Sequence, residues 1–226
     1  MGGQSKQLKR KAGSRQEKVV FEIYCEGEAT EVEYLALLKG LPEVEDCLAV
    51  GIHVAMAGAT PLTLVDAACS DRRSANIEAD QHWCIFDVES PKRHPYLSEA
   101  RDKARANGVR LAITNPCFEL WLVLHHTFHN GFLSTDDAVA LRKRLDGRAD
   151  KHLDPAVYRK QRPQAVTFAQ RLRAKHEGDG TNFPAATPPP EMAPLVQPRS
   201  AAVPPANNGP PGFRGELGRG IGGAGA

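Results

Sequence analysis

The sequence lacks the features that mark secreted and membrane proteins. Its five cysteines form no Cys-x-x-Cys pair, and their odd number argues against a complete disulfide framework. No stretch approaches the roughly 20 consecutive apolar residues that a membrane-spanning helix requires. The N-terminus is basic, but no apolar segment follows it directly, so it does not resemble a signal peptide. We therefore expect a cytoplasmic protein with no membrane partner.

The sequence also lacks the motifs of several common catalytic sites. The loop at 58–60 (Gly-Ala-Thr) precedes a predicted helix, but it has no Lys-Ser/Thr pair of a nucleotide-binding P-loop. No Gly-x-Ser-x-Gly elbow occurs. His125, His126 and His129 lack the paired spacing of a structural zinc site, and capping or surface roles are the simpler interpretation. Because the P-loop pair is missing, any nucleotide-driven switching of this protein must come from a partner.

An excess of one charge is missing as well, since the formal net charge is only +2. The chain as a whole is therefore not a polycation that coats nucleic acid. Basic residues are nevertheless concentrated in the segment 1–18 and in a predicted helix at 155–175. A solvated terminus and a solvated helix face are the alternatives to contacts with a phosphate backbone. The candidate nucleic-acid contacts in these two segments are Lys9, Arg10, Lys11, Arg171 and Arg173.

What the sequence does contain is a regular alternation of strand-like and helix-like segments. The predicted strands are 18–25, 50–56, 82–87 and 109–114, and the predicted helices between them are 29–40, 61–70 and 96–107. This order favours an α/β fold with a four-stranded parallel sheet covered by helices on both faces. Further helices are predicted at 117–128, 135–145 and 155–175.

The two ends of the chain differ in composition from the part between them. Residues 1–17 form a basic arm that we expect to be disordered. Ten of the 17 prolines fall in 184–226, and glycine is frequent at the end of that segment. Such a segment buries too little apolar surface to offset its ordering entropy. We therefore expect one domain at 18–180, followed by a disordered tail at 181–226.

Two acidic clusters follow predicted strands of this sheet. Glu26 comes directly after the first strand and before a glycine that lets the chain turn, and Glu31 follows in the next helix. Asp87 and Glu89 form an acid-x-acid pair at the end of the third strand. Carboxyl ends of parallel strands share one edge, where acids repel one another unless a cation neutralises them. The clusters therefore predict a divalent metal, with Mg²⁺ preferred and Mn²⁺ as an alternative. For Glu31, a favourable interaction with the helix dipole is the competing explanation.

Three segments, 24–31, 83–89 and 114–121, resemble the RloB family, whose members are found beside restriction-modification and abortive-infection genes. The third contains the distinctive string Asn-Pro-Cys-Phe-Glu-Leu-Trp, and the order of motifs is also similar to the TOPRIM module of topoisomerases, primases and OLD nucleases. The resemblance implies a TOPRIM/Rossmann-like fold with a helical C-terminal part.

Carried over residue by residue, the resemblance makes Glu26, Asp87 and Glu89 the metal-binding, catalytic acids, with Glu31 and Glu119 as additional metal candidates. For Glu119, a helix N-terminal acid is the alternative. Position 89 departs from the aspartate usual in the family. The Pro/Gly-rich tail also replaces the helix that the family has there.

The implied activity is Mg²⁺-dependent hydrolysis of phosphodiesters in DNA or RNA, in bacterial anti-phage defence, under the control of a separately encoded AAA- or ABC-type ATPase. The alternatives are a non-catalytic TOPRIM-like module that binds the ATPase or nucleic acid, and a primase-like nucleotidyl transferase. The sequence leaves the choice of nucleic acid and the formation of a homo-oligomer open.

Overall fold

The architecture is an α/β fold built on a four-stranded, fully parallel sheet, as the sequence predicts. The computed structural model describes residues 18–27, 29–56, 58–74 and 78–180, so the predicted arm and tail lie outside the described residues. The strands are β1 (Val19–Cys25), β2 (Leu48–Val54), β3 (Gln81–Asp87) and β4 (Arg110–Thr114), in the order β2-β1-β3-β4. Strand β2 lies on one side of β1, whereas β3 and β4 lie on the other side. The order of the strands therefore reverses between β1 and β3, and α/β proteins bind ligands at such a point, beyond the carboxyl ends of the strands.

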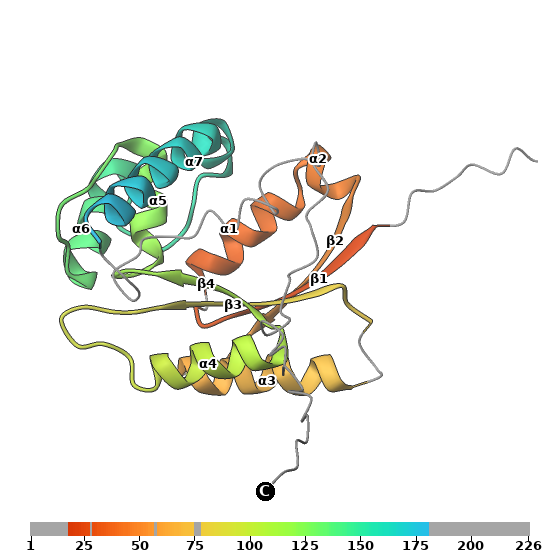
Figure 1. Cartoon of the computed structure of the whole chain (residues 1–226). Coiled ribbons are helices and arrows are strands. Elements are labelled where there is room, and N and C mark those ends of the chain that lie inside the picture. The colour runs from red at the N-terminus through yellow and green to blue at the C-terminus, as the bar shows by residue number, and fades with distance from the viewer. Residues whose placement is uncertain (1–17, 28, 57, 75–77, 181–226) are drawn as a thin grey trace, which may run out of the picture.

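Helices cover both faces of this sheet (Figure 1). One face carries α3 (Pro61–Arg73) and α4 (Leu97–Asn107), and the other carries α1 (Thr30–Lys39) with the helices of the C-terminal part. Side chains of β1 alternate accordingly, with Ile23 packing in the core on the α1 side and Tyr24 in the core on the α3 side. Two hydrophobic layers thus hold the sheet in place, and its carboxyl edge is left for polar residues.

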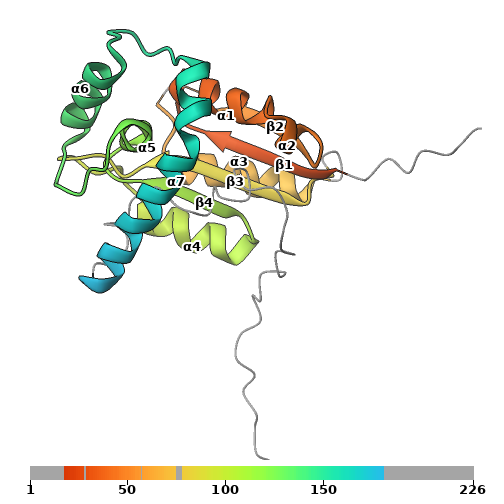
Figure 2. The same cartoon turned by 90° about the horizontal axis from the view of Figure 1, so that it is seen from above.

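The C-terminal part consists of α5 (Phe118–His126), α6 (Thr135–Asp146) and α7 (Pro155–Gly178). Helix α5 packs against both other helices, and every residue from Leu120 to His125 is buried. An α-helix that is apolar on all sides is expected in such a central position. Figure 2 shows α7 running past α5 from the side of α1. The sheet and the helical part therefore form adjoining layers.

Some element boundaries differ from the sequence-based predictions. A short helix, α2 (Pro42–Glu45), was not predicted; proline occupies its first turn, where a missing N–H costs nothing. Strand β2 begins two residues earlier than predicted because Leu48 pairs with Val19, so that β2 accompanies β1 along its full length. Tyr96, predicted as helical, precedes α4 in a left-handed conformation with φ of 61°.

A buried ionic network joins α5, α6 and α7. The carboxylate of Asp146 is only 4% exposed and lies 2.8 Å from both the Arg142 Nε and the His126 Nε2 atoms. The Tyr158 hydroxyl donates to the same carboxylate at 2.8 Å. The Arg142 guanidinium also donates to the carbonyl oxygens of Asp150 and His152. Each charge in this network is paired, which is the condition under which buried charges are tolerated.

None of the helices in the described segments combines the length and the apolar character needed to cross a bilayer.

Candidate metal centre at the carboxyl edge of the sheet

Strand pairing brings the two acidic clusters to one edge of the sheet. Strands β1 and β3 are parallel neighbours in which Cys25 lies opposite Ile85, so that Glu26 and Asp87 leave the sheet at nearly the same level. On the other side of β3, Asp87 lies opposite Thr114, the last residue of β4. The next residues lead into α5 and bring Glu119 to the same edge. The predicted convergence of acids is therefore a direct consequence of parallel register.

Asp87 is the most deeply enclosed of these acids. Its carboxylate accepts hydrogen bonds from the Thr114 hydroxyl and from the backbone N–H of Phe118. Burial nevertheless raises the pKa of Asp87 well above its usual value, and the charges of Glu31 and Glu119 raise it further. No basic side chain contributes to lowering this pKa among its main causes. The environment of Asp87 therefore disfavours its anionic form unless a cation binds nearby.

Glu31 reaches the same edge because residue 27 is glycine. The Glu31 carboxylate lies directly against the Gly27 Cα, in space that the Cβ of any other residue would occupy. Burial, together with repulsion from Glu119 and Glu26, raises the pKa of Glu31 to about 7. Glu31 is therefore more than a first-turn helix acid, since a simple interaction with the helix dipole would lower its pKa.

Glu26 lies between this group and the loop that follows β3. Its Oε1 atom is 2.9 Å from the Nε2 atom of His94, which is also 3.8 Å from Glu89 Oε1. The second oxygen, Oε2, is buried and has no hydrogen-bond partner in the described part of the chain. Burial raises the pKa of Glu26 despite the nearby histidine. An acceptor oxygen without a donor is costly when buried, so this atom is suited to an added cation.

Glu89 is held in position by its backbone. It has a φ of 62°, which is uncommon for a residue other than glycine. The N–H of Glu89 donates to the carbonyl of Pro116, and Ser90 exchanges hydrogen bonds with Thr135 at the start of α6. The side chain is 45% exposed. The loop is therefore fixed by two neighbouring segments, and the carboxylate of Glu89 stays near the solvent.

Hard carboxylate oxygens are the ligands that Mg²⁺ and Mn²⁺ take in proteins, and the mutual repulsion of these acids fits a divalent cation. In the described ranges, no three or more His, Cys, Asp or Glu side chains are already arranged around a common metal position. Glu26, Asp87 and Glu89 remain predicted ligands, with Glu31 and Glu119 as additional ones.

The predicted nucleic-acid contacts have varied surroundings. The guanidinium of Arg171 lies over the ring of Phe128, at 4.2 Å from its centroid. Arg173 pairs with Glu177 one helical turn away, at 2.7 Å. Lys9, Arg10 and Lys11 lie outside the described residues. The role of all five stays a prediction.

His94 was missed by sequence reasoning. The available signal was a histidine in the same loop as the acid pair, followed by proline. Its contact with Glu26 joins segments that are far apart in the sequence, and only the folded chain brings them together.

An α/β protein with a cluster of acids at the carboxyl edge of a parallel sheet belongs to a class that places ligand sites at this edge. The profile of the RloB-like protein family matches residues 21–197, which is more than half of the chain, and the protein therefore belongs to this family. No curated protein and no solved structure matches the chain.

Proposed function

We propose that this protein is a Mg²⁺-dependent nuclease that hydrolyses phosphodiester bonds in DNA or RNA. The observation that carries the proposal is the electrostatic state of the edge: the pKa values of Glu26, Glu31 and Asp87 are all raised. Burial of these acids and the repulsion between them weaken the folded protein, so their presence at the usual ligand position of the fold is best explained by a function that uses a cation.

In this proposal, Glu26, Asp87 and Glu89 hold the metal, which polarises the scissile phosphate and activates a water molecule when bound. Thr114 and the N–H of Phe118 orient the Asp87 carboxylate. Glu31 is suited to accept the proton of the attacking water, because its pKa of about 7 lies close to neutrality. His94 orients Glu26 through their 2.9 Å contact.

The biological setting belongs to the proposal as well. Membership of the RloB-like family supports a role in bacterial anti-phage defence of the abortive-infection type, in the cytoplasm, with an AAA- or ABC-type ATPase as controlling partner. Co-purification of the protein with the product of a neighbouring ATPase gene tests this part of the proposal independently of cleavage.

The direct test is an incubation of the purified protein with labelled single- and double-stranded DNA and RNA, with Mg²⁺, Mn²⁺ or chelator. We expect metal-dependent cleavage that falls by at least about a hundredfold in Asp87→Asn, since a metal site supplies several kcal/mol of transition-state stabilisation. Asp136→Asn, at an exposed aspartate in the first turn of α6, is the matched control and keeps full activity. Equal cleavage by all three proteins would overturn the proposal.

A non-catalytic binding module is the second candidate. It is favoured by one observation, that the described acids do not already surround a common metal position. This candidate predicts binding of nucleic acid or of the ATPase without cleavage under any metal condition. Incorporation of nucleotides in place of cleavage would instead indicate a primase-like transferase.

A further inference from the structure

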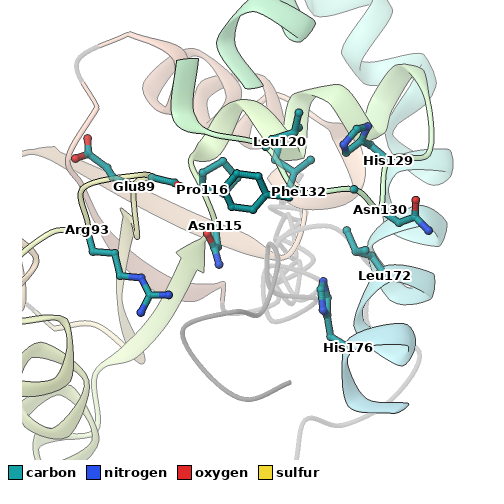
Figure 3. A pocket seen from close by; sticks show the side chains of 13 residues that line it. Glu89, Arg93, Asn115, Pro116, Leu120, His129, Asn130, Phe132, Leu172 and His176 are labelled. Carbon is teal, nitrogen blue, oxygen red and sulfur yellow. The ribbon is translucent and has the colours of Figure 1, made fainter. Parts of the chain in front are cut away.

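A cleft opens beside the acidic edge, between the loop after β3, the segment that joins α5 to α6, and the end of α7. Its volume is about 320 Å³. Glu89 and Pro116 line it on the side of the acidic edge, whereas Leu172 and His176 line it on the side of α7 (Figure 3). The cleft therefore begins where the predicted metal ligands end.

The lining of this cleft favours an anion. Arg93, His129 and His176 contribute nitrogen atoms from three separate segments, and Arg93 extends toward the open space between the loop and α7 (Figure 3). Glu89 is the single carboxylate among the described lining residues, and its side chain points away from the other labelled side chains. Arg93 forms no ion pair with any other described residue. A flexible, exposed guanidinium of this kind is available for a phosphate group.

His129 supplies a second indication of a ligand. Its Nε2 atom is buried and has no hydrogen-bond partner among the described residues. Buried side-chain nitrogen atoms are nearly always paired in folded proteins, and each exception calls for an explanation. Because this atom has almost no accessible surface in the present arrangement, the ring must turn toward the cleft before a polar ligand there becomes its partner.

An exposed aromatic ring stands in the middle of the same cleft. Phe132 is 86% exposed, and its ring lies next to Pro116 and Asn115 with one side open to the cleft (Figure 3). An aromatic ring beside cationic side chains is the combination with which proteins hold the bases and the backbone of a nucleic-acid strand. In a duplex the faces of the bases are already stacked on each other, so a ring in this position meets a base face only when the strand is single.

We propose that this cleft binds single-stranded nucleic acid, with a backbone phosphate between Arg93 and His176 and a base against Phe132. The inference rests on the proposed function, which it deepens by naming the form of the substrate. The strand runs from the cleft past Glu89, so that the next phosphodiester lies at the acidic edge. Direct binding of a phosphate in the cleft, and binding of a phosphodiester through a metal at the edge, explain why the lining changes from cationic in the cleft to anionic at the edge.

The test is fluorescence anisotropy with a short labelled oligonucleotide, in chelator and with the full-length Asp87→Asn protein, so that binding is measured without cleavage. Phe132→Ala should weaken binding about tenfold, because base–aromatic stacking is lost. Arg93→Gln should weaken binding and also lower the slope of log K against log salt by about 0.7, the value for one phosphate contact to a single strand. A duplex of the same sequence should bind more weakly than the single strand and should not respond to Phe132→Ala.

Matched controls come from residues outside the cleft. Lys92 is the exposed basic neighbour of Arg93, and Met56 has the same exposed fraction as Phe132, 86%. Lys92→Gln and Met56→Ala should bind like the parent protein. All four substitutions are at exposed positions, and equal melting temperatures establish that folding is unchanged.

Several outcomes would overturn the inference: no binding by the parent protein, cleft variants that behave like the controls, or duplex binding that depends equally on Phe132. The cleavage assay tests the nuclease independently of the binding assay. Strand binding that needs Phe132, without any metal-dependent cleavage, leaves the cleft assignment in place and overturns the nuclease. Cleavage that needs Asp87 but neither Phe132 nor Arg93 supports the nuclease and overturns the cleft assignment. Preferential binding of a phosphorylated peptide over the oligonucleotide would assign the cleft to a protein partner and would also overturn the inference.

Discussion

Asp87 and Asp146 are two enclosed aspartates in opposite electrostatic environments. Asp146 lies among Arg142, His126 and Tyr158, and its carboxylate oxygens face a cation or a donor. Asp87 has the Thr114 hydroxyl and one backbone N–H as donors, while the charges that act on it most strongly, Glu31 and Glu119, are negative. The first arrangement holds helices together without any ligand. In the proposed function a cation completes the second arrangement, and this difference would separate a structural acid from a functional one.

The largest expected effect is the loss of stability when the structural acid is neutralised. Asp146→Asn leaves the Arg142 guanidinium enclosed without its counter-charge, which we expect to cost about 3–5 kcal/mol in the free energy of unfolding. Asp87→Asn should leave that free energy unchanged or raise it, since it removes a carboxylate that is repelled by its neighbours. Urea denaturation of both variants in chelator measures the contrast. A loss of similar size in both variants would contradict the distinction between the two sites.

The next effect is a dependence of stability on pH at Glu31. Its folded-state pKa of about 7 exceeds the ordinary value of 4.5, so the folded protein keeps a proton that the unfolded chain releases. Stability from this group is therefore fully present below about pH 4.5 and is lost as the pH rises through about 7. We expect a loss of about 1–3 kcal/mol between about pH 5 and about pH 8 without metal, which Glu31→Gln and Mg²⁺ each reduce; part of the loss remains in Glu31→Gln because the pKa values of Glu26 and Asp87 are also raised.

The control for this prediction is Glu33, in the same turn of α1. Its carboxylate accepts hydrogen bonds from His152 and from the Leu153 N–H, and these contacts lower the pKa of Glu33 despite a desolvation effect in the opposite direction. Its contribution is present above the unfolded pKa and is lost as the pH falls through the folded one. Glu33→Gln should therefore leave the loss between about pH 5 and about pH 8 intact. If Glu33→Gln abolished that loss, the assignment to Glu31 would be wrong.

A smaller effect is expected from Gly27→Ala. The added Cβ overlaps the Glu31 carboxylate, which must turn away from the edge. We expect a smaller rise of the melting temperature on addition of Mg²⁺, by about half, and weaker cleavage. Gly178→Ala, where a Cβ meets nothing within 4 Å, is the matched control and should respond to Mg²⁺ like the parent protein. An unchanged response of Gly27→Ala would show that Glu31 acts independently of this position.

The smallest effect is expected at Glu89. Asp tolerates the left-handed backbone at this position better than Glu does, and its shorter arm limits the freedom of the carboxylate. Glu89→Asp should lower the metal concentration at half-maximal cleavage a few-fold, whereas Glu89→Gln should raise it. A rise with both substitutions would show that the length of the glutamate is needed.

The fold and the main acids could be predicted because they depend on local pattern. Apolar runs such as Trp83–Phe86 define strands, and parallel order then places Glu26 and Asp87 at the same edge. The environment of each acid could not be predicted in this way. The pairing of Asp146 follows from the sequence only in part, since Arg142 precedes it by one helical turn but Tyr158 is 12 residues away on another helix.

The sequence by itself determined the parallel sheet, the positions of the acids at its carboxyl edge, and membership of the RloB-like family. Only the tertiary structure decided which acids are paired and which repel one another, that Glu31 reaches the edge over Gly27, and that Arg93, Phe132 and His176 line one cleft. The physical reason is that the positions of the strands along the chain follow from short-range hydrophobic periodicity, whereas a carboxylate's charge state depends on neighbours from distant segments.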